Sequence, residues 1–390
     1  MKPKNIVKNS IIGATTIFIA TILVRMFTLS TDITLVKTIK TPDLSEISEM
    51  FSGDYRQKAI ALDGRVIQGT SMEPQPIAST AKMILSLAIM REKPFDLGSQ
   101  GESITITPEF FNRYLWYVAH NGSNTRVLVG EQISQYDALA SVLLASSNNM
   151  ADTLAIWAFD SLESYQNYAT NMLQEMGITN TTIGVDASGY DESTTSTAED
   201  LAKIASELLK NPVLKEIVGL KSHVVPVANE IQNTNKILGN SLNNGSTVIG
   251  VKTGYIGDIS GYNLVSAYEI DGHIVTLALL GANTRSDSFE GSENELLKLS
   301  QEITHTIIAN KDEKVGYLET WWSGQHEIYA DEELKVIGVK SDELQIDLSD
   351  SGLTATLNGE ASNIKTHHEA FPKSPTIWER FLHVFGWRHE

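Results

Sequence analysis

The spacing of apolar and polar residues along the chain predicts several kinds of element. Residues 76–90, PIASTAKMILSLAIM, are apolar on nearly every side of a helix and include one lysine, Lys82. A second, mostly apolar helical run over residues 134–158 is interrupted by SSNN. From Thr247 onward the period changes to the alternation that is typical of strands. The chain is therefore expected to combine buried helices with strands.

Turn residues mark where several of these elements end. Asp63-Gly64 and Asp271-Gly272 each lie between two alternating segments, and this dipeptide favours a tight hairpin because both residues tolerate a positive φ. An amphipathic helix over SYQNYATNMLQEM is expected to end at Gly177.

The N-terminus has the pattern of an export signal. Lys2, Lys4 and Lys8 precede an uncharged run over residues 9–24. We interpret residues 1–30 as an uncleaved signal-anchor, a transmembrane segment whose positive end is cytoplasmic and which leaves the rest of the chain extracytoplasmic. A form that is secreted after cleavage of this leader stays open as the alternative.

Shorter segments with their own patterns are expected before residue 53 and after residue 312. Residues 31–52 are polar with scattered apolar positions and are interpreted as a tether. Short alternating segments over residues 315–368 predict a separate small β domain. Residues 374–390 predict an amphipathic C-terminal helix, whose aromatic face either lies in a membrane interface or packs on the β domain.

Composition narrows the classes of function. The 390 residues are 42% hydrophobic, which is enough for a sizeable core and for more than one domain. The formal net charge of −18 disfavours binding to nucleic acid, because the chain would repel the phosphate backbone. The absence of cysteine excludes disulfides, thiolate metal sites and a cysteine nucleophile.

Ser79 and Lys82 are the first candidates for catalysis. They are three residues apart, so they share one face of a helix. An amine among apolar residues at a helix N-terminus loses its proton readily, since burial and the helix dipole both disfavour its charge. Lys82 is thus a candidate base for a serine nucleophile. The alternative is a capping serine beside a lysine that extends to water.

The polar residues inside the second apolar run are the next candidates. Buried Ser146 and Asn148 would each cost about 1–3 kcal/mol without a hydrogen-bond partner, so they are expected to have a partner or a function. Ser146 is a candidate proton relay, and Asn148 is a candidate to hold a substrate amide. The other register, Ser147 with Asn149, stays open.

Lys252, Thr253 and Gly254 follow the strand segment TVIGV. A cation and a hydroxyl suit a carboxylate-bearing substrate that lies along the strand edge, and the glycine permits close approach of the backbone. The alternative is an ordinary strand end followed by a turn.

Ser-x-x-Lys, Ser-x-Asn and Lys-Thr-Gly occur here in the order that resembles the motif set of penicillin-recognising serine enzymes. PIASTAKM, LLASSNNMADTLA, TSTAEDLAKIA, NTNKIL and GVKTGYIGDISGYNLVSA together resemble the low-molecular-mass D-alanyl-D-alanine carboxypeptidases, serine peptidase family S11. The resemblance covers roughly residues 52–310. It implies a mixed α/β fold of the penicillin-binding and β-lactamase-like transpeptidase type. An antiparallel sheet flanked by helices and a helical cluster would form the catalytic domain, over residues 53–312.

The resemblance also implies catalytic roles. Ser79 would be the acylated nucleophile and Lys82 its general base. Ser146 would assist proton transfer, and Asn148 would orient the peptide. No cofactor and no metal ion is implied.

The same resemblance implies how the substrate is held. Lys252 and Thr253 would take the terminal carboxylate of a D-Ala-D-Ala peptide, beside Gly254. Tyr255 would supply a backbone N–H to the oxyanion, together with that of the nucleophile. Arg285 is a further candidate for the carboxylate, and it departs from the family pattern by following LLGA more closely.

The implied activity is that of a serine-type D-Ala-D-Ala carboxypeptidase, which trims peptidoglycan stem peptides during cell-wall remodelling and is inhibited by β-lactams. A DD-endopeptidase of the same family, a class A-like β-lactamase and a non-catalytic penicillin-binding protein stay open. Glu163 and Asn167 have the spacing of a β-lactamase motif but are interpreted as solvent-facing. His326 and His368 lack a second ligand four residues later, which disfavours a zinc peptidase.

Overall fold

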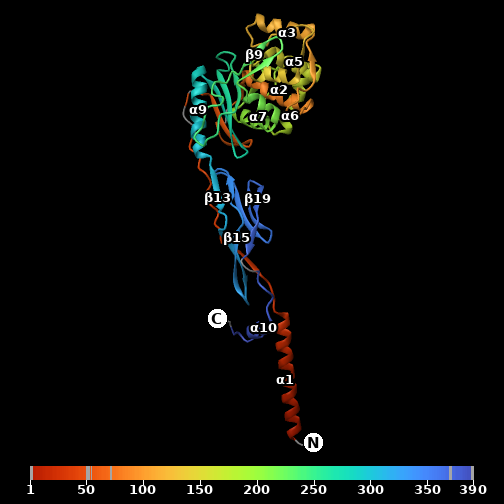
Figure 1. Cartoon of the computed structure of the whole chain (residues 1–390), viewed down its shortest axis with the longest axis vertical. Helices are drawn as coiled ribbons and strands as arrows, with labels where there is room; N and C mark the ends of the chain where they lie inside the picture. The colour runs from red at the N-terminus through yellow and green to blue at the C-terminus, as the bar shows by residue number, and fades with distance from the viewer. Residues whose placement is uncertain (1–2, 50–52, 54, 71–72, 369–370, 388–390) are drawn as a thin grey trace. The chain divides into compact units, whose positions relative to one another are not determined.

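The computed structural model describes residues 3–49, 53, 55–70, 73–368 and 371–387, with the backbone alone over residues 3–14. The chain forms two compact units (Figure 1). The larger unit is Ile47–Ile303, and the smaller one is assembled from both ends of the chain, Met1–Glu46 and Thr304–Glu390.

A five-stranded antiparallel sheet forms the centre of the larger unit. Its strands, in spatial order, are β10 (Gly250–Gly254), β11 (Tyr262–Ile270), β12 (His273–Ala282), β2 (Gln57–Leu62) and β3 (Arg65–Gly69). Almost every residue of β12 is buried, as is typical of a strand covered on both faces. Helices α7 (Ala198–Lys210) and α9 (Arg285–Glu302) lie on opposite sides of this sheet (Figure 1).

Both predicted hairpin turns are present. Strands β2 and β3 pair up to Leu62 and Arg65 on either side of the first turn, and β11 and β12 pair up to Ile270 and His273 on either side of the second. The Asp and Gly of each turn all have positive φ, at +50°, +87°, +48° and +87° in chain order. This is the backbone geometry that the Asp-Gly dipeptide favours, so both predictions are confirmed.

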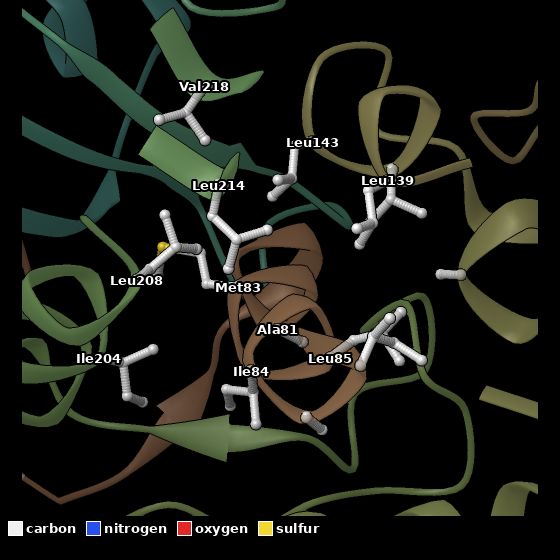
Figure 2. Packing of buried hydrophobic residues seen from close by; sticks show 14 of the residues in the cluster. Ala81, Met83, Ile84, Leu85, Leu139, Leu143, Ile204, Leu208, Leu214 and Val218 are labelled. Atoms are coloured by element: carbon white, nitrogen blue, oxygen red, sulfur yellow. The ribbon is translucent and has the colours of Figure 1, made fainter. Parts of the chain in front are cut away.

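Helix α2 (Lys82–Glu92) is the centre of the helical cluster. Figure 2 shows its residues Met83, Ile84 and Leu85 among apolar side chains from α4 (Gln135–Leu143), α7 and α8 (Pro212–Gly219). The surrounding side chains are Leu139, Leu143, Ile204, Leu208, Leu214 and Val218, and all are buried. Because other helices cover α2 on its different sides, it lacks a polar face, as its sequence predicts.

The other helices of the cluster begin at capping side chains. They are α3 (Pro108–Ala119), α5 (Asn148–Phe159) and α6 (Leu162–Glu175), with N-caps at Thr107, Ser147 and Ser161. The apolar run over residues 134–158 is divided between α4 and α5, and the SSNN interruption lies where the two helices meet. Helix α6 is followed by Gly177 at φ +69°, which confirms the predicted end.

Short elements connect these helices to the sheet. The 3₁₀ helix η1 (Ala78–Ala81) joins β4 (Gln75–Pro76) to α2, and β4 pairs with β7 (Thr195–Ser196). Two further antiparallel pairs are β5 (Ser103–Thr105) with β6 (Gln132–Ser134), and β8 (Ser222–Val225) with β9 (Asn229–Gln232).

The described residues of the smaller unit form three antiparallel sheets. One has the order β1-β14-β15-β20, with bounds Thr34–Lys37, Lys314–Thr320, Gly324–Ala330 and Thr366–His368. The second pairs β13 (His305–Ala309) with β16 (Leu334–Ile337), and the third is β17-β18-β19, at Leu344–Ser349, Gly352–Leu357 and Glu360–Ile364.

Two segments of this unit differ from the boundaries expected from the sequence. Strand β1 lies inside residues 31–52, which were interpreted as a tether, and its Leu35 and Val36 oppose Leu318 and Tyr317 of β14. Strand β13 falls within the range expected for the catalytic domain but pairs with β16. Strands of four or five residues are too short for their alternation to identify their partners, which are distant in sequence.

Two helices of the smaller unit contact each other. They are α1 (Pro3–Thr28) and α10 (Ile377–Val384), and the Arg380 guanidinium of α10 donates to the Met26 carbonyl of α1 at 3.1 Å. The His383 ring of α10 lies 4.2 Å from the Trp321 ring, between centroids, while Trp378 is 60% exposed. Among the residues with described side chains, no helix combines the length and the apolar character needed to cross a membrane.

Candidate active site

Ser79 lies in the 3₁₀ turn η1, which leads directly into α2. Side chains three residues apart nearly eclipse one another in such a turn, so those of Ser79 and Lys82 meet. A hydrogen bond joins Lys82 Nζ to Ser79 Oγ at 2.8 Å. Ala78, just before the serine, has a φ of +50°, a region that non-glycine residues rarely adopt.

The Lys82 side chain is completely buried. Its Nζ also bonds to Asn148 Oδ1 at 2.7 Å and to the Ser188 carbonyl at 2.9 Å. Burial lowers the pKa of Lys82 to about 7, although the charges of Asp186 and Asp152 act in the opposite direction. A substantial neutral fraction is therefore available near neutral pH to accept a proton from the serine.

Ser146 and Asn148 lie at the junction of α4 and α5. Asn148 is the first residue of α5 and directs its amide oxygen to Lys82, while Ser146 precedes α5 with a φ of +59°. The helical run expected over residues 134–158 is therefore two helices, with Asn148 at the start of the second and Ser146 outside both.

Ser147 and Asn149, the other register, have structural contacts. Ser147 Oγ accepts from the Met150 N–H as the N-cap of α5 and donates to Asn149 Oδ1 at 2.8 Å. Asn149 bonds to both the N–H and the carbonyl of Thr125. These contacts hold the loop before α5, and they leave Ser146 and Asn148 as the pair at the site.

Lys252 lies on β10 and is only 1% exposed. Its Nζ donates to the Thr253 carbonyl at 3.1 Å. Burial, and secondarily the charge of Lys82, hold the pKa of Lys252 well below its usual range. The next hydroxyl along the strand, Thr253 Oγ1, lies 2.7 Å from Thr234 Oγ1.

Gly254 allows β10 to approach η1 closely. A Cβ at this position would lie 2.9 Å from the Ile77 carbonyl oxygen and 3.2 Å from the Ser79 nitrogen. The strand edge therefore lies against the turn that carries the serine, and a side chain at residue 254 would separate them.

An open cleft with a volume of about 300 Å³ exposes Ser79, Ser146 and Thr253, whereas Lys82, Asn148 and Lys252 are absent from the described residues that line it. Tyr255 follows Gly254 into the cleft, and its ring stacks on Tyr262 at 4.1 Å between centroids. The structure also places Arg285, the first residue of α9, at this cleft. The complete lining is Ser79, Ser123, Ser146, Thr234, Thr253, Gly254, Tyr255, Tyr262, Asn263, Arg285, Ser288 and Phe289.

The Peptidase_S11 family model, described as D-alanyl-D-alanine carboxypeptidase, matches residues 58–284, more than half of the chain. The chain belongs to the D-alanyl-D-alanine carboxypeptidase family. The D-alanyl-D-alanine carboxypeptidase DacC of Escherichia coli (strain K12) is 28% identical over 273 residues, which are 67% of this chain and 64% of that relative. The match thus spans less than two thirds of the length of this curated relative.

Solved structures of penicillin-binding proteins resemble this family member in fold. The Streptomyces K15 DD-transpeptidase has a TM-score of 0.57 at 20% identity, over 65% of this chain and 99% of that chain. A peptidoglycan synthesis regulatory factor (PBP3) from Streptococcus pneumoniae has a TM-score of 0.63 at 19% identity, over 78% and 92%. The fold class expected from the sequence, a mixed α/β penicillin-binding type, is confirmed.

Sequence reasoning missed a loop that contacts Lys82 in this family member. Asp186 oxygens accept from the Ser188 N–H and hydroxyl, each at 2.6 Å, and from the N–H groups of Tyr190 and Asp191. These bonds fix the loop whose Ser188 carbonyl bonds to the lysine. The available signal was the Asp-x-Ser-Gly pattern, which favours a turn closed by the aspartate side chain.

Asp152 is a second residue that the sequence gave no reason to select. It is 3% exposed on α5, and it accepts from the Tyr117 hydroxyl at 2.9 Å and from the Ala187 N–H at 3.2 Å. Burial raises its pKa to about 6, and the charge of Asp186 adds to this rise. A single acidic residue within an apolar run has no sequence pattern that indicates which residues it contacts.

Asn263, on β11, supports the turn that carries Ser79. Its Nδ2 donates to the Ile77 carbonyl at 3.1 Å, and its Oδ1 accepts from the Gly281 N–H at 2.8 Å. The residue thereby ties η1 to two strands of the central sheet, a contact that depends on tertiary structure alone.

Proposed function

We propose that this protein is a serine-type DD-carboxypeptidase that removes the terminal D-alanine from peptidoglycan stem peptides through an acyl-enzyme on Ser79. The observation that carries the proposal is the hydrogen bond between the buried Lys82 amine and Ser79 Oγ, next to an open cleft. Membership of the D-alanyl-D-alanine carboxypeptidase family supports the same reaction.

In the acylation step, neutral Lys82 takes the proton of Ser79 Oγ, and the oxygen attacks the carbonyl carbon of the penultimate D-alanine. The negative charge develops on the carbonyl oxygen, where the backbone N–H groups of Ser79 and Tyr255 stabilise it. The close approach of β10 to η1 at Gly254 supports this pairing, because Tyr255 follows directly. Asn148 orients the substrate amide.

The tetrahedral intermediate then loses the terminal D-alanine. The C–N bond breaks as the leaving nitrogen receives the proton held by Lys82, relayed by Ser146, which lines the cleft. In deacylation, Lys82 takes a proton from water, the resulting hydroxide attacks the ester, and Ser79 Oγ recovers its proton. The products are D-alanine and a peptide shorter by one residue.

The carboxylate of the leaving D-alanine binds at the other side of the cleft. Thr253 and Thr234 present hydroxyls there, and Arg285 supplies a positive charge at the exposed rim. The buried Lys252 amine lies on the same strand, and burial holds its pKa below its usual range. Binding of an anion nearby would favour its protonation.

A β-lactamase is less well supported than a carboxypeptidase. Glu163 is exposed in the first turn of α6 and is absent from the described residues that line the catalytic cleft. A carboxylate in that position has no access to the ester on Ser79, so hydrolysis of a β-lactam acyl-enzyme should be slow.

Intact-mass measurement after incubation with a fluorescent penicillin tests the nucleophile. The wild type should gain one stable adduct, and Ser79→Ala should gain none. Ser362→Ala is the matched control, because Ser362 opens a second Ser-x-x-Lys on β19 and should leave labelling intact. An adduct on Ser79→Ala would contradict the proposal, whereas absence of any adduct on the wild type would favour a binding protein.

Product analysis separates the peptidase alternatives. A carboxypeptidase releases free D-alanine from a pentapeptide, whereas an endopeptidase converts cross-linked muropeptide dimers into monomers. We expect D-alanine release to dominate, and faster cleavage of the cross-linked dimer would favour the endopeptidase.

We also propose that the enzyme acts outside the cytoplasm and is held at the cell membrane by α1. Support comes from the lysine-rich leader and from the exposure of apolar side chains on this helix, such as Phe18 at 61% and Phe27 at 68%. The intact chain should fractionate with membranes in carbonate buffer, and a chain starting at residue 31 should not. A mature N-terminus near residue 30 would instead show cleavage and secretion.

A further inference from the structure

Among the described residues, three groups form hydrogen bonds with Lys82 Nζ, and only one of them has a proton to give. A neutral amine carries two hydrogens and one lone pair. The Asn148 amide oxygen and the Ser188 carbonyl are acceptors, so each takes one hydrogen of the amine. The lone pair is then left for Ser79 Oγ, whose proton it accepts. The positions of the two acceptor oxygens therefore decide whether the lone pair faces the serine.

Asp152 connects the two segments that carry these acceptors. It lies four residues after Asn148 on α5, so the two side chains share one face of the helix. Its Oδ1 accepts from the N–H of Ala187, the residue before Ser188, at 3.2 Å. The distance between the two acceptor oxygens thus depends on where this carboxylate lies.

Tyr117 holds the Asp152 carboxylate from α3. Its hydroxyl donates to Asp152 Oδ2 at 2.9 Å, and Arg113, one turn earlier on α3, lies 3.4 Å from the same oxygen. Tyr117 and Asp152 are each 3% exposed, so little water competes for the bond between them. The carboxylate therefore has a fixed position, and the nearby guanidinium offsets part of its buried charge.

Tyr117 also supports Asn148, through the loop after α3. A Cβ added to Gly122 would lie 2.8 Å from the Tyr117 ring and 3.0 Å from Asn148 Nδ2, so this glycine fills the space between them. The Gly122 N–H donates to the Tyr117 carbonyl, and the Asn148 N–H donates to the Ser123 carbonyl, both at 2.8 Å. Tyr117 thus supports both acceptors of the lysine without belonging to the described residues that line the catalytic cleft.

We propose that Tyr117 and Asp152 are positioning residues for the acylation of Ser79. They hold the two acceptor oxygens where these occupy both hydrogens of neutral Lys82, so that its lone pair points to the serine hydroxyl. The inference rests on the proposed function, because acylation of the serine is the step that it explains. Since neither residue lines the catalytic cleft in the described part of the chain, both act on the reaction through the lysine.

Tyr117→Phe tests this role, because it removes one hydroxyl and keeps the ring. Acylation by fluorescent penicillin is measured at pH 9, where Lys82, with a pKa of about 7, is neutral in both proteins. We expect acylation to be about tenfold slower, because a base turned away from its proton donor reacts more slowly. A change in the pKa of the lysine cannot cause this loss. At saturating penicillin, the rate constant should fall while the dissociation constant of the noncovalent complex is unchanged.

Tyr136→Phe is the matched control. It removes a similarly buried hydroxyl that also bonds to a carboxylate, that of Glu216 at 2.6 Å, between α4 and α8. This pair supports neither acceptor of Lys82, so the variant should keep the wild-type rate at pH 9. Thermal unfolding of both variants checks that they lose a similar amount of stability.

Lys82→Met/Tyr117→Phe separates a role through the lysine from a role in general packing. Without the amine there is no lone pair to direct, so Tyr117→Phe should cause no further loss of the residual acylation in the Lys82→Met background. A second tenfold loss in that background would show that Tyr117 acts on Ser79 or on the cleft, and it would overturn the proposal.

The remaining outcomes distinguish the positioning role from the proposed function. Equal rates for the wild type and Tyr117→Phe at pH 9, or an equal loss in Tyr136→Phe, would overturn the positioning role and leave the carboxypeptidase function standing. If the wild type forms no penicillin adduct and releases no D-alanine, the proposed function fails and the positioning role fails with it.

Discussion

Gly189 lies so close to Ala78 that a Cβ added to the glycine would come within 2.1 Å of the Ala78 carbonyl oxygen. The loop that carries Ser188 therefore packs directly on the turn that carries Ser79. Lys82 bonds to both, through the Ser79 hydroxyl and the Ser188 carbonyl. The position of the Ser79 hydroxyl relative to the Lys82 amine depends on this contact between two segments that are about a hundred residues apart.

Gly189→Ala should slow acylation of Ser79 by fluorescent penicillin about 100-fold, because an ångström-scale displacement of a reacting group has that effect. Gly177→Ala is the matched control, since its φ of +69° equals that of Gly189 within one degree while its added Cβ meets nothing within 4 Å. Both variants carry the same backbone strain. Equal rates in the two would contradict the steric argument.

Lys82→Met should lower the second-order acylation rate by about 10²–10⁴-fold, the usual loss when a general base is removed. Methionine is apolar and of similar length, so it suits the fully buried position. Lys365→Met, in the second Ser-x-x-Lys of the chain, should retain the wild-type rate. A rate for Lys82→Met within a few-fold of the wild type would exclude the lysine as the base.

The acylation rate should rise with pH and level off above pH 7, because Lys82, whose pKa is lowered to about 7, accepts the serine proton only when it is neutral. Below this pH, the neutral fraction falls about tenfold for each further unit. Stopped-flow measurement of the acylation rate between pH 5 and 9 tests this pH dependence. A rate that is flat across this range would show that no group titrating near 7 limits acylation.

Asp152→Asn should lower the pH at which the acylation rate levels off. The negative charge of Asp152 raises the pKa of Lys82, so its removal favours the neutral amine. Asparagine keeps an oxygen that can accept from the Tyr117 hydroxyl, so the packing should survive. If the acylation rate levels off at the same pH or at a higher pH, the electrostatic argument is contradicted.

Arg285→Ala should lower kcat/KM about 10- to 100-fold for a peptide that ends in a free D-Ala carboxylate, which corresponds to the loss of one charge-assisted contact. The same peptide with a C-terminal amide should show little difference between variant and wild type. An equal loss with both peptides would assign Arg285 a structural role instead.

The sequence predicted much of the local structure, for physical reasons that act over short distances. An Asp-Gly turn tolerates its positive φ wherever the chain places it, so both hairpins were predictable. The apolar character of α2 on all sides predicted its burial, and burial predicted the lowered pKa of Lys82. The spacing of Ser79 and Lys82 was enough to predict that their side chains meet.

Only the tertiary structure shows which groups from distant segments of the chain lie at the site. It decided between Ser146 with Asn148 and Ser147 with Asn149, because only the packing of α5 against α2 shows which amide faces the lysine. It also brought Arg285 to the catalytic cleft. Short spacing in sequence constrains geometry within about one helical turn, whereas contacts across loops depend on how whole elements pack.

The sequence by itself thus determined a Ser-x-x-Lys pair with a buried lysine, and the hairpins of the sheet. Only the folded chain decided that the Ser188 carbonyl bonds to the lysine and that β1 from the N-terminal part pairs with β14. The reason is that backbone carbonyls and strand edges occur throughout any chain, and only the packing of distant segments decides which of them meet.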